Sequence, residues 1–280
     1  MALYGIVADI HGNLEALCEA VGFLLEDQGV HHIVCLGDIV GYNAEPDACV
    51  ELIQEVSMDT VAGNHDLIAA GLLGFERCAD RPAFALRRTR EVLSDATLQK
   101  LMGLPHRRVI EDEIVLVHAG FRDVCQYVTT SARVEENHDM MVREIPRARV
   151  CFFGHTHTRK VWEIHKGAAS ELEPGEEVDL SGSDRAYFVN PGSIDASRKE
   201  DGERFAEVAV FDSSRRTVSF HRVPYNHERV EQLASSGGYR MTPFEERIHR
   251  ATRRLMRGKD RVLARLQGRL PLLLQSGDPS

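Results

Sequence analysis

The chain has 280 residues, of which 43% are hydrophobic and 28% are charged, enough apolar material for one large globular domain with appendages. A net charge of −9 and a pI near 5.8 exclude a general attraction to nucleic acid or to anionic membranes. No stretch is long and apolar enough to span a bilayer, so we expect no transmembrane segment.

The first half of the sequence alternates short apolar runs with helical periodicities. Strands are predicted at "LYGIVAD", "HHIVCLGD" and "DTVAGNHD", with helices over 13–29 and 45–56 between them. This order indicates a mostly parallel sheet flanked by helices. A helical insertion is predicted at about 75–104. The runs "EIVLVHAG" and "ARVCFFGHTH" then predict two more strands, separated by a helix near 132–145.

The pattern changes from Val161 onward. Short, alternating, turn-punctuated runs such as "RAYFVNPGS", "RFAEVAVFD" and "TVSFHRV" predict antiparallel strands. Parallel strands first and antiparallel strands later predict two sheets packed face to face in one domain, residues 1–238.

A basic helical tail is predicted over residues 239–280, which hold ten Lys or Arg and four Asp or Glu. The favoured interpretation is a helix that packs on the domain or forms a homo-oligomer. A helix on a membrane surface is an alternative. Nucleic-acid binding is the weakest alternative, because no aromatic platform accompanies the charge.

The amino-terminal run "ALYGIVA" is too short for a signal peptide and lacks a basic leader. The six cysteines form no CxxC pair, and several lie inside apolar runs such as "IVCLGD". Buried, reduced thiols are therefore favoured over a disulfide framework. Together these features predict a cytoplasmic protein.

Five short motifs each follow an apolar run: "DIH", "GD", "GNHD", "VHAG" and "GHTH". The carboxyl ends of strands in an open α/β sheet line a common crevice, so we expect the five motifs to converge there. Residues i and i+2 of a strand point the same way. Asp9 with His11, and His155 with His157, would then each offer two ligands to one side.

Each motif taken singly, except "GNHD", is more often structural than functional. Five in this order at strand ends instead indicate one metal site. The groups are too many for one metal and suit two metals about 3.5–4 Å apart. Oxygen and imidazole ligands without thiolate suit Mn, Fe, Zn, Ni or Co.

The five motifs, over about residues 1–212, resemble the pattern of the calcineurin-like metallophosphoesterase superfamily. The resemblance implies a four-layer α/β/β/α sandwich of two mixed sheets flanked by helices. It also implies two divalent transition metal ions, Mn being favoured, and a small phosphoester substrate. Carried over by position, the first metal is bound by Asp9, His11 and His157, the second by Asn64, His118 and His155, and both by Asp38.

The resemblance also assigns the groups around the metals. His65 is expected to face the substrate and to give a proton or a hydrogen bond to the leaving group, and Asn64 to contact the substrate. Asp66 either orients His65 as part of the catalytic group or caps a helix. The implied reaction is hydrolysis of a phosphodiester or phosphomonoester by a hydroxide held between the metals.

The block "GDIVGYN" indicates which branch of the superfamily the chain resembles. It lacks the arginine found there in protein Ser/Thr phosphatases and in symmetrical dinucleoside tetraphosphatases. The likeness is to small bacterial and archaeal phosphoesterases of the YfcE-like branch. Those also carry an "NPGS" block, so Asn190 and Ser193 are candidate substrate contacts, with a structural hairpin turn as the alternative.

Three further arginines, in the insertion, could reach a substrate phosphate, although a solvated helix face is favoured: Arg87, Arg88 and Arg90. The predicted substrate is a small, nucleotide-like phosphoester. A phosphoprotein phosphatase is an alternative. A non-catalytic interaction module on the same fold is another, but such a protein has no need to keep all seven ligands.

Overall fold

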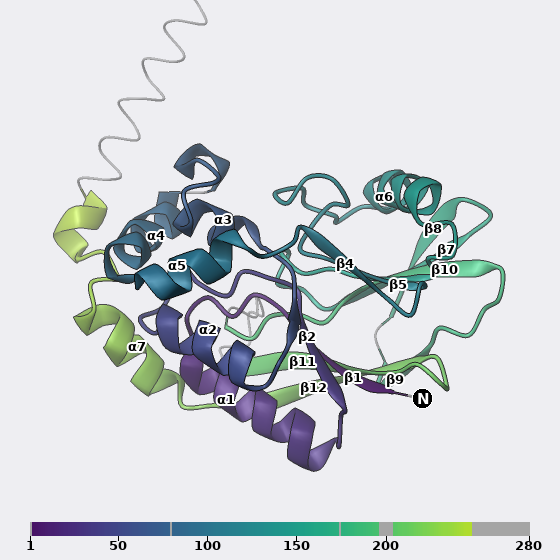
Figure 1. Cartoon of the computed structure of the whole chain (residues 1–280), viewed down its shortest axis with the longest axis horizontal. Helices are drawn as coiled ribbons and strands as arrows, with labels where there is room; N and C mark the ends of the chain where they lie inside the picture. Colours follow the sequence, from purple (N-terminus) through teal and green to yellow (C-terminus); the bar gives the residue numbers. More distant parts are fainter. Residues whose placement is uncertain (1, 79, 174, 196–203, 248–280) are drawn as a thin grey trace, which may run out of the picture. The chain divides into compact units, whose positions relative to one another are not determined.

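The structure, a computed structural model, describes residues 2–78, 80–173, 175–195 and 204–247. The chain divides into two compact units, Met1–Tyr239 and Arg240–Ser280. The predicted basic tail helix, and the oligomer predicted to form through it, fall mostly on residues 248–280, outside the described residues. Figure 1 labels most of the helices and strands of the first unit.

The helices begin and end largely where local signals place them. Asn13 caps the first helix by accepting from the backbone N–H of Ala16, and Pro46 stands at the start of the second. Ser94 likewise accepts from Thr97. The helices are α1 (Leu14–Gly22) continuing as a π-helical turn η1 (Phe23–Asp27), α2 (Pro46–Glu55), α3 (Asn64–Ala69), the 3₁₀ turn η2 (Phe75–Arg77), α4 (Asp80–Val92), α5 (Asp95–Met102), α6 (Ser131–Glu144) and α7 (His227–Ser236).

The first sheet contains six strands in the order β3-β2-β1-β11-β12-β9. Its first three strands are parallel, and β11 then pairs with β1 in the antiparallel sense. The strands are β1 (Leu3–Val7), β2 (His32–Cys35), β3 (Asp59–Thr60), β9 (Glu177–Asp179), β11 (Phe205–Asp212) and β12 (Thr217–Pro224).

The second sheet has the order β4-β5-β6-β10-β7-β8. Strands β5, β6 and β10 are parallel to one another, whereas β4, β7 and β8 add antiparallel edges. The strands are β4 (Arg107–Ile110), β5 (Ile114–Val117), β6 (Val150–Phe152), β7 (Lys160–His165), β8 (Ala168–Leu172) and β10 (Arg185–Asn190).

Alternation along the central strands sorts apolar side chains into three layers of core. Ile6 of β1 and Phe152 of β6 face each other's sheets and lie in one cluster between them. Val7 lies in a second cluster with α1 and α2, and Cys151 in a third with α6. Helices therefore cover both outer faces of two packed sheets, as Figure 1 shows, and the predicted four-layer fold is confirmed.

Three features differ from the sequence predictions. Strand β10, from the run "RAYFVNPGS" that predicts an antiparallel strand, is antiparallel to β7 but parallel to β6, so it joins the parallel part of the second sheet. Strands β4 and β8 and helices α3 and α7 were not predicted. Cys18 is exposed, while Cys78 and Cys125 are half-buried; all six cysteines are nevertheless free.

Candidate metal centre

The seven predicted metal ligands lie in loops or at a helix start beyond strand ends, not on the strands themselves. Five of them have a positive φ: Asp9 (55°), His11 (54°), Asp38 (54°), His155 (66°) and His157 (54°). Left-handed backbone is uncommon for residues other than glycine and concentrates at functional sites. Tight left-handed turns, not extended strand, therefore aim these side chains, so the predicted strand alternation is wrong for Asp9 with His11 and for His155 with His157. His155 and His157 also belong to different clusters of ligand atoms.

Backbone hydrogen bonds join neighbouring ligand loops. The N–H of Asp9 donates to the carbonyl of Gly37 (3.0 Å), and the N–H of His11 donates to the carbonyl of Asp38 (2.8 Å). On the second sheet, the N–H of Gly154 donates to the carbonyl of His118 (2.8 Å). The backbone N–H of His155 reaches across and donates to both carboxylate oxygens of Asp9 (3.1 and 3.0 Å). The loops of both sheets are thus held as one frame.

The glycines of the "GD" and "GNHD" motifs permit this close approach. A Cβ on Gly37 would lie 2.5 Å from the backbone nitrogen of Gly63, and one on Gly63 would lie 2.1 Å from Oδ1 of Asp38. Any side chain at Gly63 would therefore displace the central carboxylate. This contact explains physically why glycine precedes the ligand in each motif.

The first cluster of ligand atoms comprises Asp9, His11, Asp38 and His157, all buried. One atom from each residue lies within 4.8 Å of every other. The Nε2 atoms of His11 and His157 face each other at 3.1 Å, and Nε2 of His157 lies 3.5 Å from Oδ1 of Asp9. Imidazole nitrogens and carboxylate oxygens aimed at one point form a donor set for a divalent transition metal.

The second cluster comprises Asp38, His118 and His155, and it is also buried. Nε2 of His118 lies 3.2 Å from Nδ1 of His155 and 3.2 Å from Oδ1 of Asn64. Its Nδ1 contacts the carbonyl of Leu36 at 2.8 Å, which fixes the ring so that Nε2 faces the cluster. The sequence-predicted residues thus fit two metals, with Asp38 common to both groups.

Charges in the centre depend strongly on one another. Burial opposes the ionised form of Asp38, but His118 and His65 outweigh it and hold the pKa of that carboxyl well below its usual value. Burial would lower the pKa of His118, but the Asp38 carboxylate raises it to about 9. Burial lowers the pKa of His155 to about 3. An imidazole holds a metal in its neutral form, so His118 would have to be deprotonated to serve as a metal ligand.

His65 lies beside the predicted metal ligands. Its Nε2 atom is 4.0 Å from Oδ2 of Asp38, and its ring centre is 4.6 Å from that of His11. Its Nδ1 atom is buried and has no hydrogen-bond partner among the described residues. A Cβ on Gly41 would meet this atom at 2.5 Å, so the ring packs directly on the backbone of the "GDIVGYN" loop.

Asp66 bonds to backbone and not to His65. Its Oδ2 accepts from the N–H groups of Asp38 (2.8 Å) and Gly63 (2.9 Å), and its Oδ1 accepts from Ile39 (2.9 Å) and Val40 (3.2 Å). Burial, with the nearby Asp38, raises the pKa of Asp66 to about 7. The bond to Gly63 caps α3, the helix-cap alternative; these contacts give no support to a catalytic role.

Asn190 and Ser193 are fully buried behind the ligand loops. The side-chain amide of Asn190 donates to the carbonyl of Gly154 (2.8 Å) and to Oγ1 of Thr156 (3.1 Å). The hydroxyl of Ser193 donates to the carbonyl of Asp9 (3.0 Å). Both side chains therefore hold ligand loops in place, and the predicted substrate contacts gain no support.

The helical insertion reaches the site through a residue that sequence reasoning missed. Thr89 of α4 is buried and donates from Oγ1 to the carbonyl of Gly41 (3.0 Å), the residue under His65. The three arginines of α4 lie elsewhere: Arg87 and Arg90 are exposed over the ring of Phe75, and Arg88 donates to the carbonyl of Gly237. The favoured interpretation of an outer helix face fits these contacts.

Two tyrosines beside the ligands were also missed. The ring of Tyr42 lies 4.4 Å from that of His11, on the side of the first cluster. The ring of Tyr127 lies 4.4 Å from that of His155, on the side of the second, and is 53% exposed. The motif pattern carried no signal for Tyr127, because it lies in the loop after β5 and outside every block.

Comparisons with known proteins identify the family to which the chain belongs. A sequence profile of the calcineurin-like phosphoesterase superfamily domain matches residues 2–215. The chain is 30% identical over 236 residues to an uncharacterized protein, MJ0912, of Methanocaldococcus jannaschii, covering 82% of this chain and 90% of that one. A metallophosphoesterase from Sphaerobacter thermophilus has a similar structure, with a TM-score of 0.65, 31% identity, and coverage of 84% of this chain and 94% of that one.

This chain therefore belongs to the calcineurin-like phosphoesterase superfamily, as the five motifs predicted. Similar solved structures also include YfcE, a phosphoesterase from E. coli, at 18% identity, a TM-score of 0.39, and coverage of 79% of this chain and 100% of that one. Among the described residues, no helix is both long enough and apolar enough to cross a membrane.

Proposed function

We propose that this chain is a phosphoesterase that binds two divalent transition metal ions and hydrolyses a small phosphodiester or phosphomonoester. One observation carries the proposal: the buried carboxylate of Asp38 belongs to both ligand clusters. A carboxylate shared in this way is the bridging group that a two-metal centre requires. Of the metals that suit these ligands, manganese is favoured. We also propose that the protein is cytoplasmic.

When bound, the metals would polarise the phosphoryl oxygens and lower the pKa of a bound water to supply the nucleophile. The chain's own groups would position the reaction. Asn64 starts α3 and points its amide oxygen into the second cluster. His65 follows it on the same short helix and lies against the ring of His11. The imidazole N–H of His65 would hydrogen-bond the leaving-group oxygen as charge develops there.

Tyr127 supports a nucleotide-like substrate. Its exposed ring beside His155 offers a flat apolar face next to the proposed second metal. Every nucleobase has a π-face that can stack on such a ring, so this contact would favour a base without selecting one. A protein phosphatase would require a surface for a peptide, and no observation in the described residues favours that alternative.

The proposal is tested by assaying the purified protein with bis-p-nitrophenyl phosphate, p-nitrophenyl phosphate and a panel of nucleotides. Each assay would follow removal of metal and addition of Mn²⁺, Ni²⁺, Zn²⁺ or Fe²⁺. We expect hydrolysis that depends on added metal and is strongest with Mn²⁺. A metal-loaded protein that hydrolyses none of these esters would contradict the proposal and favour a non-catalytic module.

A further inference from the structure

A cavity of about 500 Å³ lies beside the second ligand cluster. His118 forms part of its wall, and Gly120, Phe121, Arg122 and Val124 of the loop after β5 form another part. The strand β4 and the residue before it add Arg107 and His106. A volume of this size is within the range of small-ligand sites, which is about 300–1,000 Å³.

The wall of this cavity is positively charged in a protein of net charge −9. Its lining includes Arg107 and Arg122, and none of its described lining residues is an aspartate or glutamate. Glu144, which does not line the cavity, forms ion pairs with both arginines. Its Oε2 lies 2.6 Å from Nη2 of Arg107, and its Oε1 lies 2.5 Å from Nη2 of Arg122. Because no other carboxylate among the described residues pairs with either arginine, the two leave one positive charge uncompensated beside the second ligand cluster.

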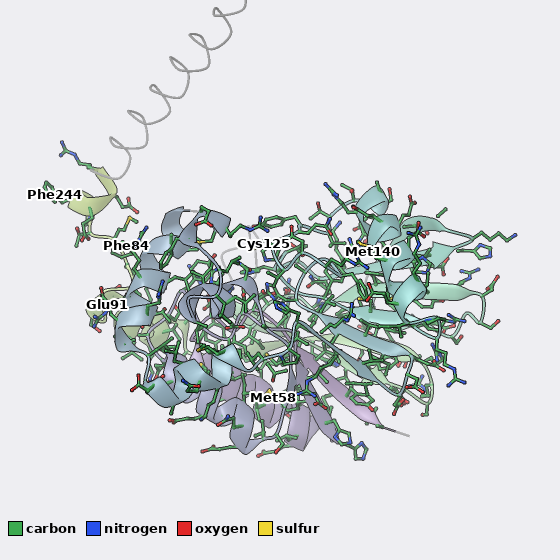
Figure 2. All side chains as sticks on the ribbon, turned by 45° about the horizontal axis from the view of Figure 1, so that its top comes forward. Met58, Phe84, Glu91, Cys125, Met140 and Phe244 are labelled. Carbon is green, nitrogen blue, oxygen red and sulfur yellow. The ribbon has the colours of Figure 1, made fainter. Side chains whose placement is uncertain are left out.

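The loop that carries Arg122 is held at two points. The ion pair with Glu144 ties it to the end of α6, and an ion pair between Arg77 and Asp123 (2.7 Å) ties it to η2. Figure 2 labels Cys125 on this loop and Met140 on α6. Arg107 also lies 4.7 Å from the ring centre of Phe121, which fixes one guanidinium against an apolar wall. Arg107 is thus placed by packing and by charge, and Arg122 by its ion pair with Glu144.

We propose that this cavity binds a second anionic group of the substrate, a phosphate apart from the one that is hydrolysed, with Arg107 and Arg122 as the residues that recognise it. Guanidinium groups bind phosphate oxygens through paired, charge-assisted hydrogen bonds. A bound phosphate would share the arginines with Glu144. The inference rests on the proposed function only in placing the first phosphate at the metal centre.

The experiment compares ligands with one and two phosphates. Dissociation constants for AMP, ADP and adenosine 3′,5′-bisphosphate would be measured by calorimetry on Mn²⁺-loaded protein carrying His65→Asn to slow turnover. We expect ADP or the bisphosphate to bind at least about tenfold more tightly than AMP, the equivalent of about 1.4 kcal/mol. Arg107→Gln with Arg122→Gln should reduce this preference to within about twofold.

Two further variants separate ligand recognition from a structural role. Glu144→Gln removes the carboxylate that competes for both arginines, so under the proposal it should strengthen binding of the two-phosphate ligand. If the arginines had only a structural role, Glu144→Gln would instead weaken binding, as the two arginine changes would. Arg147→Gln removes an arginine that is 79% exposed and lies outside the cavity wall, and should leave the preference unchanged. Thermal melting would establish that each variant folds.

An equal affinity for one and two phosphates in the parent protein, or a preference that survives the double arginine change, would overturn the inference. Hydrolysis of bis-p-nitrophenyl phosphate by the wild type tests the proposed function separately. A metal-loaded wild-type protein that hydrolyses neither this diester nor p-nitrophenyl phosphate nor any nucleotide of the panel, but shows the arginine-dependent preference in binding, would refute the proposed function and leave the second anion site standing.

Discussion

The carboxylate of Asp66 accepts a hydrogen bond of 2.8 Å from the backbone N–H of Asp38, the residue shared by both ligand clusters. The same carboxylate also accepts from the N–H of Gly63, which begins the turn into α3. One buried side chain therefore fixes the "GD" loop against the "GNHD" turn. This relationship fixes the backbone of Asp38, whose carboxylate belongs to both clusters, and gives Asp66 a positioning role.

Asp66→Asn is expected to loosen the metal centre. An amide replaces one acceptor oxygen with an NH₂ group, leaving two buried backbone N–H groups unpaired at about 1–3 kcal/mol each. We expect the free energy of unfolding in urea to fall by about 2–6 kcal/mol and metal content to fall with it. Asp212→Asn is the matched control, because Asp212 also accepts from backbone N–H groups but in an exposed turn. Wild-type stability and metal content in Asp66→Asn would refute the positioning role.

His65→Asn is expected to keep the metals and lose turnover. The side chain lies outside both ligand clusters, and loss of a positioned proton or hydrogen-bond donor typically costs about 10²–10⁴-fold in rate. Metal content by mass spectrometry and kcat with bis-p-nitrophenyl phosphate would be measured on the same preparation. His165→Asn is the control, because His165 is the last residue of β7 and its ring pairs with Asp184. Unchanged kcat would remove His65 from the reaction, and lost metal would make it a ligand.

Thr89→Val, in the helical insertion, is expected to lower kcat. The hydroxyl of Thr89 holds the carbonyl of Gly41, and Gly41 supports the ring of His65. Valine keeps the shape but removes a hydrogen bond worth about 1 kcal/mol, so we expect kcat to fall roughly fivefold with little change in KM. Thr89→Ser keeps the hydroxyl and should restore the rate. Equal rates for the valine and serine variants would refute this link.

Tyr127→Ala is expected to weaken nucleotide substrates selectively. Stacking of a base on an aromatic ring is worth about 1–3 kcal/mol, and because this ring is half exposed we expect the lower end, a KM rise of about fivefold. Tyr127→Phe should behave as the wild type, since stacking does not need the hydroxyl. The readout is the ratio of KM values for a nucleotide and for p-nitrophenyl phosphate. A ratio that stays constant in Tyr127→Ala would show that the ring does not contact a base.

The motifs predicted which side chains come together, because the residue types that can bind a metal are visible in the sequence. Asp9 and His155 come from different sheets, and their convergence follows from the position of each motif after a strand. The reason offered for their direction was wrong. Left-handed turns at Asp9 and His11 are set by backbone bonds to the neighbouring loop, and such long-range bonds leave no periodicity in sequence.

Other features depend on contacts between segments far apart in the chain. The partition of late strands between two sheets is set by β11 pairing with β1, which alternation within β11 cannot specify. Helix α3 was missed because its short sequence "NHDLIA" contains the motif itself and too few residues for a helical period. Arg122 and Glu144 gave no sequence signal, since a cation and an anion on separate elements are ordinary on any surface.

The two-metal centre is tested most directly by counting metal ions in the wild type and in Asp38→Asn. Each protein would be stripped with chelator, incubated with Mn²⁺, freed of excess metal and measured by inductively coupled plasma mass spectrometry. We expect two manganese ions per wild-type chain and a loss of at least one in Asp38→Asn, because that carboxylate belongs to both clusters. A wild-type chain that retains no metal, or an Asp38→Asn chain that retains two, would contradict the shared-carboxylate centre.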